Sequence, residues 1–391
     1  MSDTPTASIG FAEDHDVEAF RRRLPFKVEP TNIPGIYSVP APPMDFDLLT
    51  ASKHELIKHG ILIRKPTGED HPALRASWDR FCTDHWPRMV RVNPTLELRD
   101  RVSRHSRPRP KQESAGLDSD GTSWSGAFNT GGKWQGILAS WQVPAVSVPA
   151  SQTVGQPNIC PGDIPGQLPS IFPTGPWQSA SWIGIGGFVV KGGNAIPGSD
   201  IIQVGILQEI NVAGEATYQA FFEWYTSASS MAVTVPNALG SGGFSVLPGD
   251  SISASVFNDP QNNLPPQVSL YNARTGQTFS YMLGNAPAGS NDQAVSCEWV
   301  MEATNQSLTG SFGFPIIDDS TFPYFTPVIF HCTLACNSDY SAVEPWNLMQ
   351  PLEIYTQTPD SCLDNGQLTL VTVTPVVAGA IFTVEIDCLK Q

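Results

Sequence analysis

Acid and base chemistry in most of this chain is expected to come from carboxyl groups. Residues 112–391 contain 22 Asp and Glu, four Lys and Arg, and a single histidine, His331. A stretch of that size with one histidine has almost no means of building a Ser/His/Asp, a Cys/His or a histidine-rich metal site. If the protein is an enzyme, its proton transfers therefore belong to Asp or Glu.

Two glutamates near residue 300 have the spacing of a shared strand face. Glu298 and Glu302 alternate with Trp299 and Met301 in the segment 297–302. Because alternate residues of a strand point to the same face, the two carboxylates are predicted on one face and the large apolar side chains on the other.

A glutamine and an aromatic strand are further candidates. In the segment 202–206, Gln203 shares its face with a glycine, and such a small neighbour leaves room for a ligand. The segment 218–225 contains Glu223 and Trp224 within a dense aromatic run that is typical of a binding cleft. Taken singly, each of these polar residues also fits the solvated outer face of an antiparallel sheet.

The elements that must position these residues are strands. Period-two alternation punctuated by Gly, Pro and Asn predicts an all-β protein, with antiparallel sheets stacked as a β-sandwich or jelly roll. The predicted strands are residues 133–143, 179–189, 200–210, 216–225, 231–235, 251–257, 267–272, 277–283, 295–302, 326–331, 367–374 and 381–386.

The N-terminal part of the chain has the opposite charge balance. Residues 1–111 carry about +3 and six of the seven histidines, whereas the remainder carries −18, which together give the net −15. A capping box at residues 52–55 and a proline-started pattern at residues 70–81 predict two short helices. We therefore expect two parts, a basic, histidine-rich N-terminal segment with its linker at 1–115 and a β-sandwich domain at 116–391.

Several classes of function are disfavoured. The acidic balance argues against binding to nucleic acid or an anionic membrane, since phosphate contacts require clustered Lys and Arg. No apolar run is long enough to span a membrane. The group His331, Cys332 and Cys336 lacks a fourth ligand at zinc-site spacing, so we expect no metal and no cofactor. Seven cysteines leave at least one unpaired, and a bridge such as Cys362 to Cys388 fits the remainder.

Eight motifs in order resemble those of the glutamic peptidases, also called eqolisins. The resemblance is close from residue 124 to about 302 and loose beyond. The motifs are Trp-Ser-Gly at 124–126, Ala-Ser-Trp-Gln-Val-Pro at 139–144, Ser-Trp-Ile-Gly-Ile-Gly-Gly at 181–187, Ile-Ile-Gln-Val-Gly at 201–205, the segment 218–225 with its Glu-Trp-Tyr, Pro-Gly-Asp-Ser-Ile at 248–252, the segment 272–277 with its Thr-Gly-Gln, and Glu-Trp-Val-Met-Glu at 298–302.

This resemblance implies an acid-acting endopeptidase on a lectin-like β-sandwich or jelly roll, which hydrolyses proteins with a Gln/Glu dyad. The family's glutamine matches Gln203 and its catalytic glutamate matches Glu302, while its cleft positions fall on Trp182 and Glu223. Trp224 and Glu298 are expected to join them in binding substrate. A carboxylate can take a proton from water and return it to the leaving nitrogen, and a neutral amide can stabilise the oxyanion at any pH.

The chain also departs from the family pattern. Phe221 and Phe222 replace a Trp-Tyr pair, and Gly186 stands where the family commonly has Asp. Loss of that acid removes a partner for the dyad, so weaker activity or a shifted pH optimum is expected. Two other functions fit the fold. A jelly-roll glycosidase would use Glu298 and Glu302, although Val300 replaces the acid expected between them. A lectin-like binding protein would have an idle dyad.

The N-terminal segment matches the basic prosegment of this family in charge and position. We expect the segment to cover the acidic cleft and inhibit the enzyme near neutral pH. Below about pH 4, where carboxylates are protonated, we expect it to dissociate or to be cut in the linker. The alternative is a small helical accessory domain that stays attached. The family resemblance implies secretion, but residues 1–29 lack the apolar core of a signal peptide, so the location stays unassigned.

Overall fold

The fold was analysed in a computed structural model of the 391-residue chain. It describes residues 22, 24–43, 45–62, 65–69, 72–80, 82–83, 88–99, 124–130, 132–148, 177–191, 194–211, 213–226, 229–260, 264–302, 304, 308–309, 315–316, 323–337, 342–343, 350–352, 354–357, 367–377 and 381–386.

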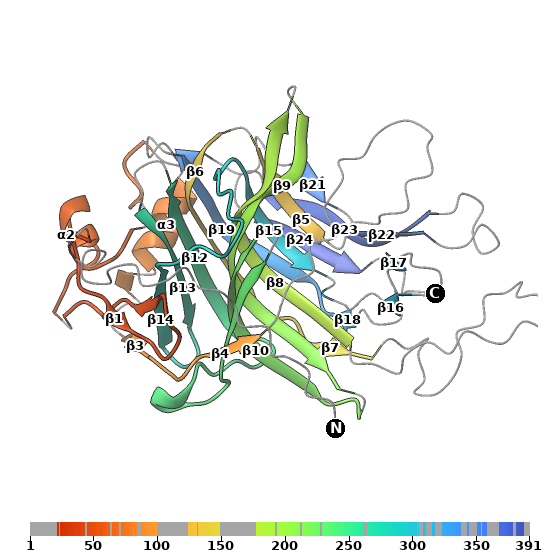
Figure 1. The fold of residues 1–391 in the computed structure, drawn as a ribbon, viewed down its shortest axis with the longest axis horizontal. Helices are drawn as coiled ribbons and strands as arrows, with labels where there is room; N and C mark the ends of the chain where they lie inside the picture. The colour runs from red at the N-terminus through yellow and green to blue at the C-terminus, as the bar shows by residue number, and fades with distance from the viewer. Residues whose placement is uncertain are drawn as a thin grey trace, which may run out of the picture.

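Two large, almost entirely antiparallel sheets dominate the described residues (Figure 1). The first has the strand order β1-β2-β14-β13-β12-β6-β19-β24-β23-β22, with β3 beside β14 and β20 beside β19. Its strands are β1 (Glu29–Pro30), β2 (Ile36–Ser38), β3 (Val90–Arg91), β6 (Trp134–Gln142), β12 (Ser251–Asp259), β13 (Leu264–Asn272), β14 (Gln277–Leu283), β19 (Val328–Asn337), β20 (Ala342–Val343), β22 (Ile354–Gln357), β23 (Gln367–Val377) and β24 (Ile381–Ile386).

The second sheet has the order β21-β5-β15-β8-β9-β10-β11-β4. Its strands are β4 (Glu97–Arg99), β5 (Trp124–Asn129), β8 (Trp177–Lys191), β9 (Asn194–Ile210), β10 (Ala216–Tyr225), β11 (Ser230–Val235), β15 (Cys297–Glu302) and β21 (Gln350–Leu352). Two short pairs complete the strands: β7 (Val146–Ser147) with β18 (Tyr324–Phe325), and β16 (Leu308–Thr309) with β17 (Pro315–Ile316). The predicted all-β sandwich is confirmed.

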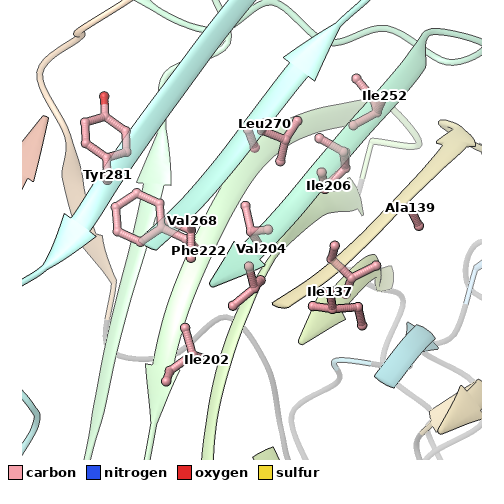
Figure 2. Close-up of a cluster of buried hydrophobic side chains, with 14 of the residues drawn as sticks. Ile137, Ala139, Ile202, Val204, Ile206, Phe222, Ile252, Val268, Leu270 and Tyr281 are labelled. Atoms are coloured by element: carbon pink, nitrogen blue, oxygen red, sulfur yellow. The ribbon is translucent and has the colours of Figure 1, made fainter. Parts of the chain in front are cut away.

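The core lies between the two sheets. Figure 2 shows Val204 and Ile206 of β9 beside Ile137 of β6 and Val268 of β13, and all four side chains are fully or almost fully buried. Trp299 and Met301 belong to the same cluster, as their alternation with the two glutamates predicted. The second sheet therefore has one face in this core, and its glutamates are on the other.

The two predicted helices are present as α2 (Lys53–Lys58) and α3 (Pro72–Arg80). In α2 the Ser52 hydroxyl accepts from the Glu55 amide while the Glu55 carboxylate accepts from the Ser52 amide, which is the predicted capping box. The N-terminal segment is nevertheless not purely helical. It also contains β1 to β4, which period-two alternation did not predict because each has only two or three residues. A single turn of 3-10 helix, η3 (Gly240–Gly242), follows β11.

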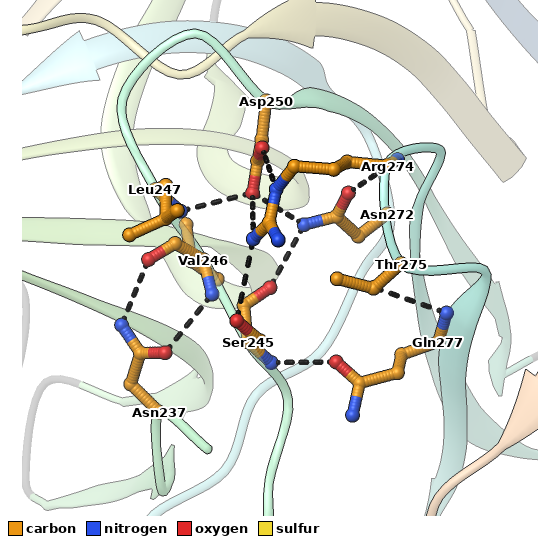
Figure 3. Close-up of polar contacts among 9 residues, drawn as sticks. All are labelled: Asn237, Ser245, Val246, Leu247, Asp250, Asn272, Arg274, Thr275 and Gln277. Atoms are coloured by element: carbon orange, nitrogen blue, oxygen red, sulfur yellow. Dashed lines mark hydrogen bonds and ion pairs between the residues drawn. The ribbon is translucent and has the colours of Figure 1, made fainter. Parts of the chain in front are cut away.

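A buried carboxylate fixes the loop between β11 and β12 (Figure 3). Asp250 accepts hydrogen bonds from the Leu247 amide, from Asn272 and from Arg274, and Gln277 accepts from the Ser245 amide. Burial by itself would raise the pKa of Asp250, but the bonds from Arg274 and Asn272 outweigh it and the pKa is lowered. Two of the eight sequence motifs, at 248–252 and 272–277, therefore hold the fold together at this loop.

Candidate active site

One lateral row of the second sheet collects the polar candidates. Glu298 of β15 lies opposite Gly184 of β8, Gly184 opposite Gln203 of β9, and Gln203 opposite Glu223 of β10. Directly opposite residues of an antiparallel pair share a face, so all these positions point to the face away from the sandwich core. Gly184 has no side chain, which leaves a gap in the row between Glu298 and Gln203.

Gln203 is held by Glu223. The Gln203 Nε2 donates to Glu223 Oε2 at 2.8 Å, and Ser230 donates a hydroxyl hydrogen bond to the other oxygen of Glu223. Gln203 and Glu223 are both 0% exposed. The amide carbonyl Oε1 of Gln203 has no hydrogen-bond partner among the described residues. The contact thus fixes the amide and leaves its carbonyl and one N–H for another group.

Glu298 is a fully buried carboxyl that lies opposite Phe128 of β5 and Gly184 of β8. Neither of its oxygens has a hydrogen-bond partner in the described part of the chain. Burial raises the pKa of Glu298 well above its usual range. The nearby Ser296 hydroxyl, whose hydrogen is donated to the Gly186 carbonyl, lowers that pKa by a smaller amount. A buried acid with a raised pKa is a candidate for proton transfer.

Glu302 lies elsewhere on the same face. Trp182 donates its indole N–H to Glu302 Oε2 at 2.8 Å, and both residues are fully buried. In the register Glu302 is opposite Ala180, and Ala180 is opposite Leu207, four residues along β9 from Gln203. Strand geometry separates the Cα atoms of Glu302 and Gln203 by roughly 16 Å, against about 10 Å for Glu298 and Gln203.

Trp224, which was expected to bind substrate, faces the opposite way. It belongs to the core cluster between the sheets, and its indole N–H donates to Asp200 Oδ2 at 3.0 Å. Its neighbour Phe222 is in the same core, whereas Phe221 packs with Trp124 and Trp182 on the face of the row. The aromatic run is therefore divided between two faces, because strand residues alternate.

Gly186 stands at a bend in β8. Its φ is +106°, and a Cβ built there would lie 1.8 Å from the carbonyl oxygen of Asp200. The pairing of β8 with β9 shifts register between Gly186 and Phe188. A side chain is therefore excluded at this position, including the Asp that the sequence resemblance led us to expect there.

Metal and membrane features were sought in the same residues. No group of three or more His, Cys, Asp or Glu that could hold a metal ion occurs among the residues described. Cys82 and Cys297 are free and buried, Cys336 is buried as well, and Cys362 and Cys388 lie outside the described residues. None of the helices in the described ranges has the length and apolar character that crossing a bilayer demands.

Comparison with known proteins identifies the family. The profile of the peptidase A4 family matches residues 122–374, more than half of the chain. The chain belongs to the peptidase A4 family. This family is that of the eqolisins, so the protein is a hydrolase of the glutamic peptidase type. No curated protein matches the chain.

Solved structures of this family are similar to the chain. A crystal structure of scytalido-glutamic peptidase with a peptide-based transition state analogue has 17% identity and a TM-score of 0.44, covering 68% of this chain and 98% of that one. SCP-B, an eqolisin in complex with the tripeptide Ala-Ile-His, has 18% identity and a TM-score of 0.43 with the same coverage.

Sequence reasoning missed two contributors to the row. Ser230 was not singled out, although it begins the strand after Glu223 and lies opposite Tyr225. Arg99 lies opposite Ala232, and Ala232 lies opposite Glu223, so the N-terminal segment reaches this row. No local pattern reveals either contact, because both depend on strand pairing.

Proposed function

We propose that this peptidase cleaves proteins as an endopeptidase, with Gln203 and Glu298 acting together on one scissile peptide bond. The observation that carries the proposal is the shared lateral row, in which Gly184 separates the two side chains. At about 10 Å between Cα atoms, two such side chains can both reach a water and a carbonyl placed between them. Glu302, the glutamate expected from the sequence, is too far along the strands for that arrangement.

The chemistry follows from the side chains. The ionised Glu298 takes a proton from water as the water attacks the peptide carbonyl, and the resulting carboxylic acid then delivers that proton to the departing nitrogen. Gln203 orients the water through its carbonyl and donates an N–H to the developing oxyanion. Glu223 holds the amide during both steps by accepting its other N–H.

We assign Glu302 and Trp182 to binding of the substrate on the same face. Their hydrogen bond fixes the Glu302 carboxylate, and the distance of about 13 Å along the strand corresponds to roughly four residues of an extended peptide. Glu302 would then contact a substrate residue away from the bond that is cut. This role predicts an effect on KM, whereas the role of Glu298 predicts an effect on kcat.

The test is proteolysis of denatured haemoglobin or casein across acidic and neutral pH, with pepstatin present. We expect Glu298→Gln and Gln203→Ala to lower kcat by about 10²-fold or more, Glu302→Gln to raise KM with a smaller change in kcat, and Glu215→Gln, a surface control, to change neither. Loss of kcat in Glu302→Gln with activity retained in Glu298→Gln would transfer the catalytic role to Glu302. Cleavage that is unchanged in Glu298→Gln, Gln203→Ala and Glu302→Gln alike would refute the site.

We also propose that the N-terminal segment, residues 1 to about 115, inhibits the uncut enzyme. Arg99, the last residue of β4, supports this, because it lies on the row of Gln203 and Glu223 and the linker that the cut opens therefore begins at that row. Inhibition would be measured by comparing the intact chain with a chain cut between residues 100 and 122, at pH values between about 5 and 7. Equal rates for the two forms would exclude an inhibitory role.

A further inference from the structure

The N-terminal segment pairs with both sheets of the sandwich. β2 continues the first sheet beyond β14, with Ile36 opposite Leu283, and β3 runs parallel to the other end of β14. β4 pairs with β11 and forms the edge of the second sheet. In Figure 1 the red and orange strands accordingly lie beside strands of both sheets. Without this segment, β14 and β11 would both present an unpaired strand edge.

The same segment supplies apolar side chains to the main core. Ile33, Ile36, Val92 and Leu96 are between 1% and 3% exposed and belong to the cluster that fills the space between the sheets. On the outer side of β14, Met282 packs with Phe26, Val28, Tyr37 and Val39. Side chains buried to this extent are part of the fold that they pack into.

Main-chain hydrogen bonds add to these contacts at both ends of β14. The Gly284 amide donates to the Gly35 carbonyl at 2.7 Å, and the Val92 amide donates to the Thr278 carbonyl at 2.8 Å. Asn32 joins two distant parts of the segment, since its side chain donates to the Leu96 carbonyl and accepts from the Leu96 amide, each at 2.8 Å. Residues 24–99, which we call the clamp, therefore connect β14 of the first sheet to β11 of the second.

Charge contributes little to the contacts that have just been described. Buried aliphatic groups and peptide hydrogen bonds do not titrate, and Arg99 meets the neutral amide of Gln219. Arg91, at the end of β3, is half-buried as a residue with part of its guanidinium buried near Tyr281, and this burial lowers the pKa of the guanidinium to about 10, so it stays charged in acid. Neutralising carboxylates therefore leaves these contacts intact.

We infer that residues 24–99 are a permanent part of the enzyme, so that cutting the chain after Arg99 leaves them bound as a second polypeptide. The region matched by the family begins at residue 122, and the clamp lies wholly outside it. Strand β4 of the clamp is the outer strand of the sheet that carries Gln203 and Glu223. Inhibition and attachment are then separate properties, because a cut can relieve the first without ending the second. This inference does not depend on which residues catalyse.

The experiment uses the full chain with a site for a specific protease inserted between residues 100 and 122. After complete cutting, size-exclusion chromatography near pH 3.5 and near pH 7 is expected to elute both polypeptides together at the position of the intact chain. A wild-type N-terminal fragment that elutes separately from a folded remainder at either pH would overturn the inference.

Matched variants test the contacts. Leu96 is 3% exposed and Leu98, two residues along, is 43% exposed. In the cut protein Leu96→Ala should weaken retention of the fragment by about thirtyfold or more, and Leu98→Ala by about twofold at most. Equal weakening by the two would overturn the assignment to the core. If Leu96→Ala does not fold, the cut wild-type protein is titrated with urea instead. Release of the fragment at the same urea concentration at which the tryptophans become exposed supports the inference. Release of the fragment at a lower urea concentration contradicts it.

Discussion

Glu298 combines an energetically unfavourable burial of its carboxyl group with the proposed chemistry. A carboxyl whose pKa is raised in the folded state destabilises the fold as pH rises above its unfolded value of about 4.3, because ionisation is harder in the folded form. We therefore expect Glu298→Gln to raise the free energy of unfolding near pH 7 and to leave it unchanged below about pH 4. The same variant should lose about 10²-fold to 10⁴-fold in kcat. Urea denaturation and peptide hydrolysis measure the two effects.

A gain in activity or a loss of stability in Glu298→Gln would contradict this account. The raised pKa has a second consequence, since only the ionised form can accept a proton from water. The acidic limb of kcat/KM should lie above the usual glutamate pKa of about 4.3, and it should report the titration of Glu298.

Glu223 is expected to act through Gln203. Substituting Glu223→Gln removes a charged acceptor while keeping the shape, so the Gln203 amide is held less firmly. We expect kcat to fall about tenfold with little change in KM, since hydrogen bonds to charged groups contribute about 1.5 to 3 kcal/mol. Steady-state kinetics on a chromogenic peptide measures the split. Ser230→Ala, which removes one bond to Glu223, should show a smaller effect in the same direction.

At the scale of elements, the bend of β8 explains the missing Asp. Gly186→Asp, which restores the family residue, should destabilise the protein by more than about 3 kcal/mol, because strain at positive φ is joined by a collision with the Asp200 carbonyl. It should not increase activity. Gly214→Asp is the matched control, since its φ is +84° and nothing lies within 4 Å of its added Cβ. If thermal unfolding shows the same loss of stability in both variants, a collision at Gly186 is excluded.

The loop fixed by Asp250 gives an element-scale test of pH dependence. Its lowered pKa contributes stability that is present above the unfolded value of about 3.9 and is lost as pH falls through the folded value. Asp250→Asn should lower the free energy of unfolding by about 1 to 3 kcal/mol near pH 7. The difference from wild type should shrink below about pH 4. A difference that stays constant with pH would show that shape, not charge, holds the loop.

The elements were largely predictable, whereas their pairing was not. Alternation of residue types located β10 and β14 to the residue, although β14 is buried along its whole length. It also placed Glu298 and Glu302 on one face. Which of the two glutamates meets Gln203 depends on the register across β8, and no residue within either strand encodes that register locally. Trp224 was assigned to the wrong face because aromatic density was considered without the alternation that separates it from Glu223.

The whole molecule carries its charge unevenly, with about +3 in residues 1–111 and −18 in the rest. If attraction between these parts held the segment in place, salt would release it, since the screening length falls from about 10 Å at 0.1 M to about 3 Å at 1 M. The contacts of Ile36, Val92 and Leu96 with the core predict the opposite, because salt does not weaken apolar burial.

We therefore expect the cut protein to keep its N-terminal fragment in 1 M NaCl near neutral pH. Activity after cutting should stay above that of the intact chain at both salt concentrations. Analytical ultracentrifugation of the cut protein measures the attachment, and hydrolysis of a peptide substrate measures the activity. A fragment lost in 1 M NaCl and retained in 0.1 M would show that charge holds the two parts together, as the sequence alone suggested. A fragment retained at both salt concentrations would show that the shared apolar core attaches it, and that core forms only when the segment and the sandwich fold together.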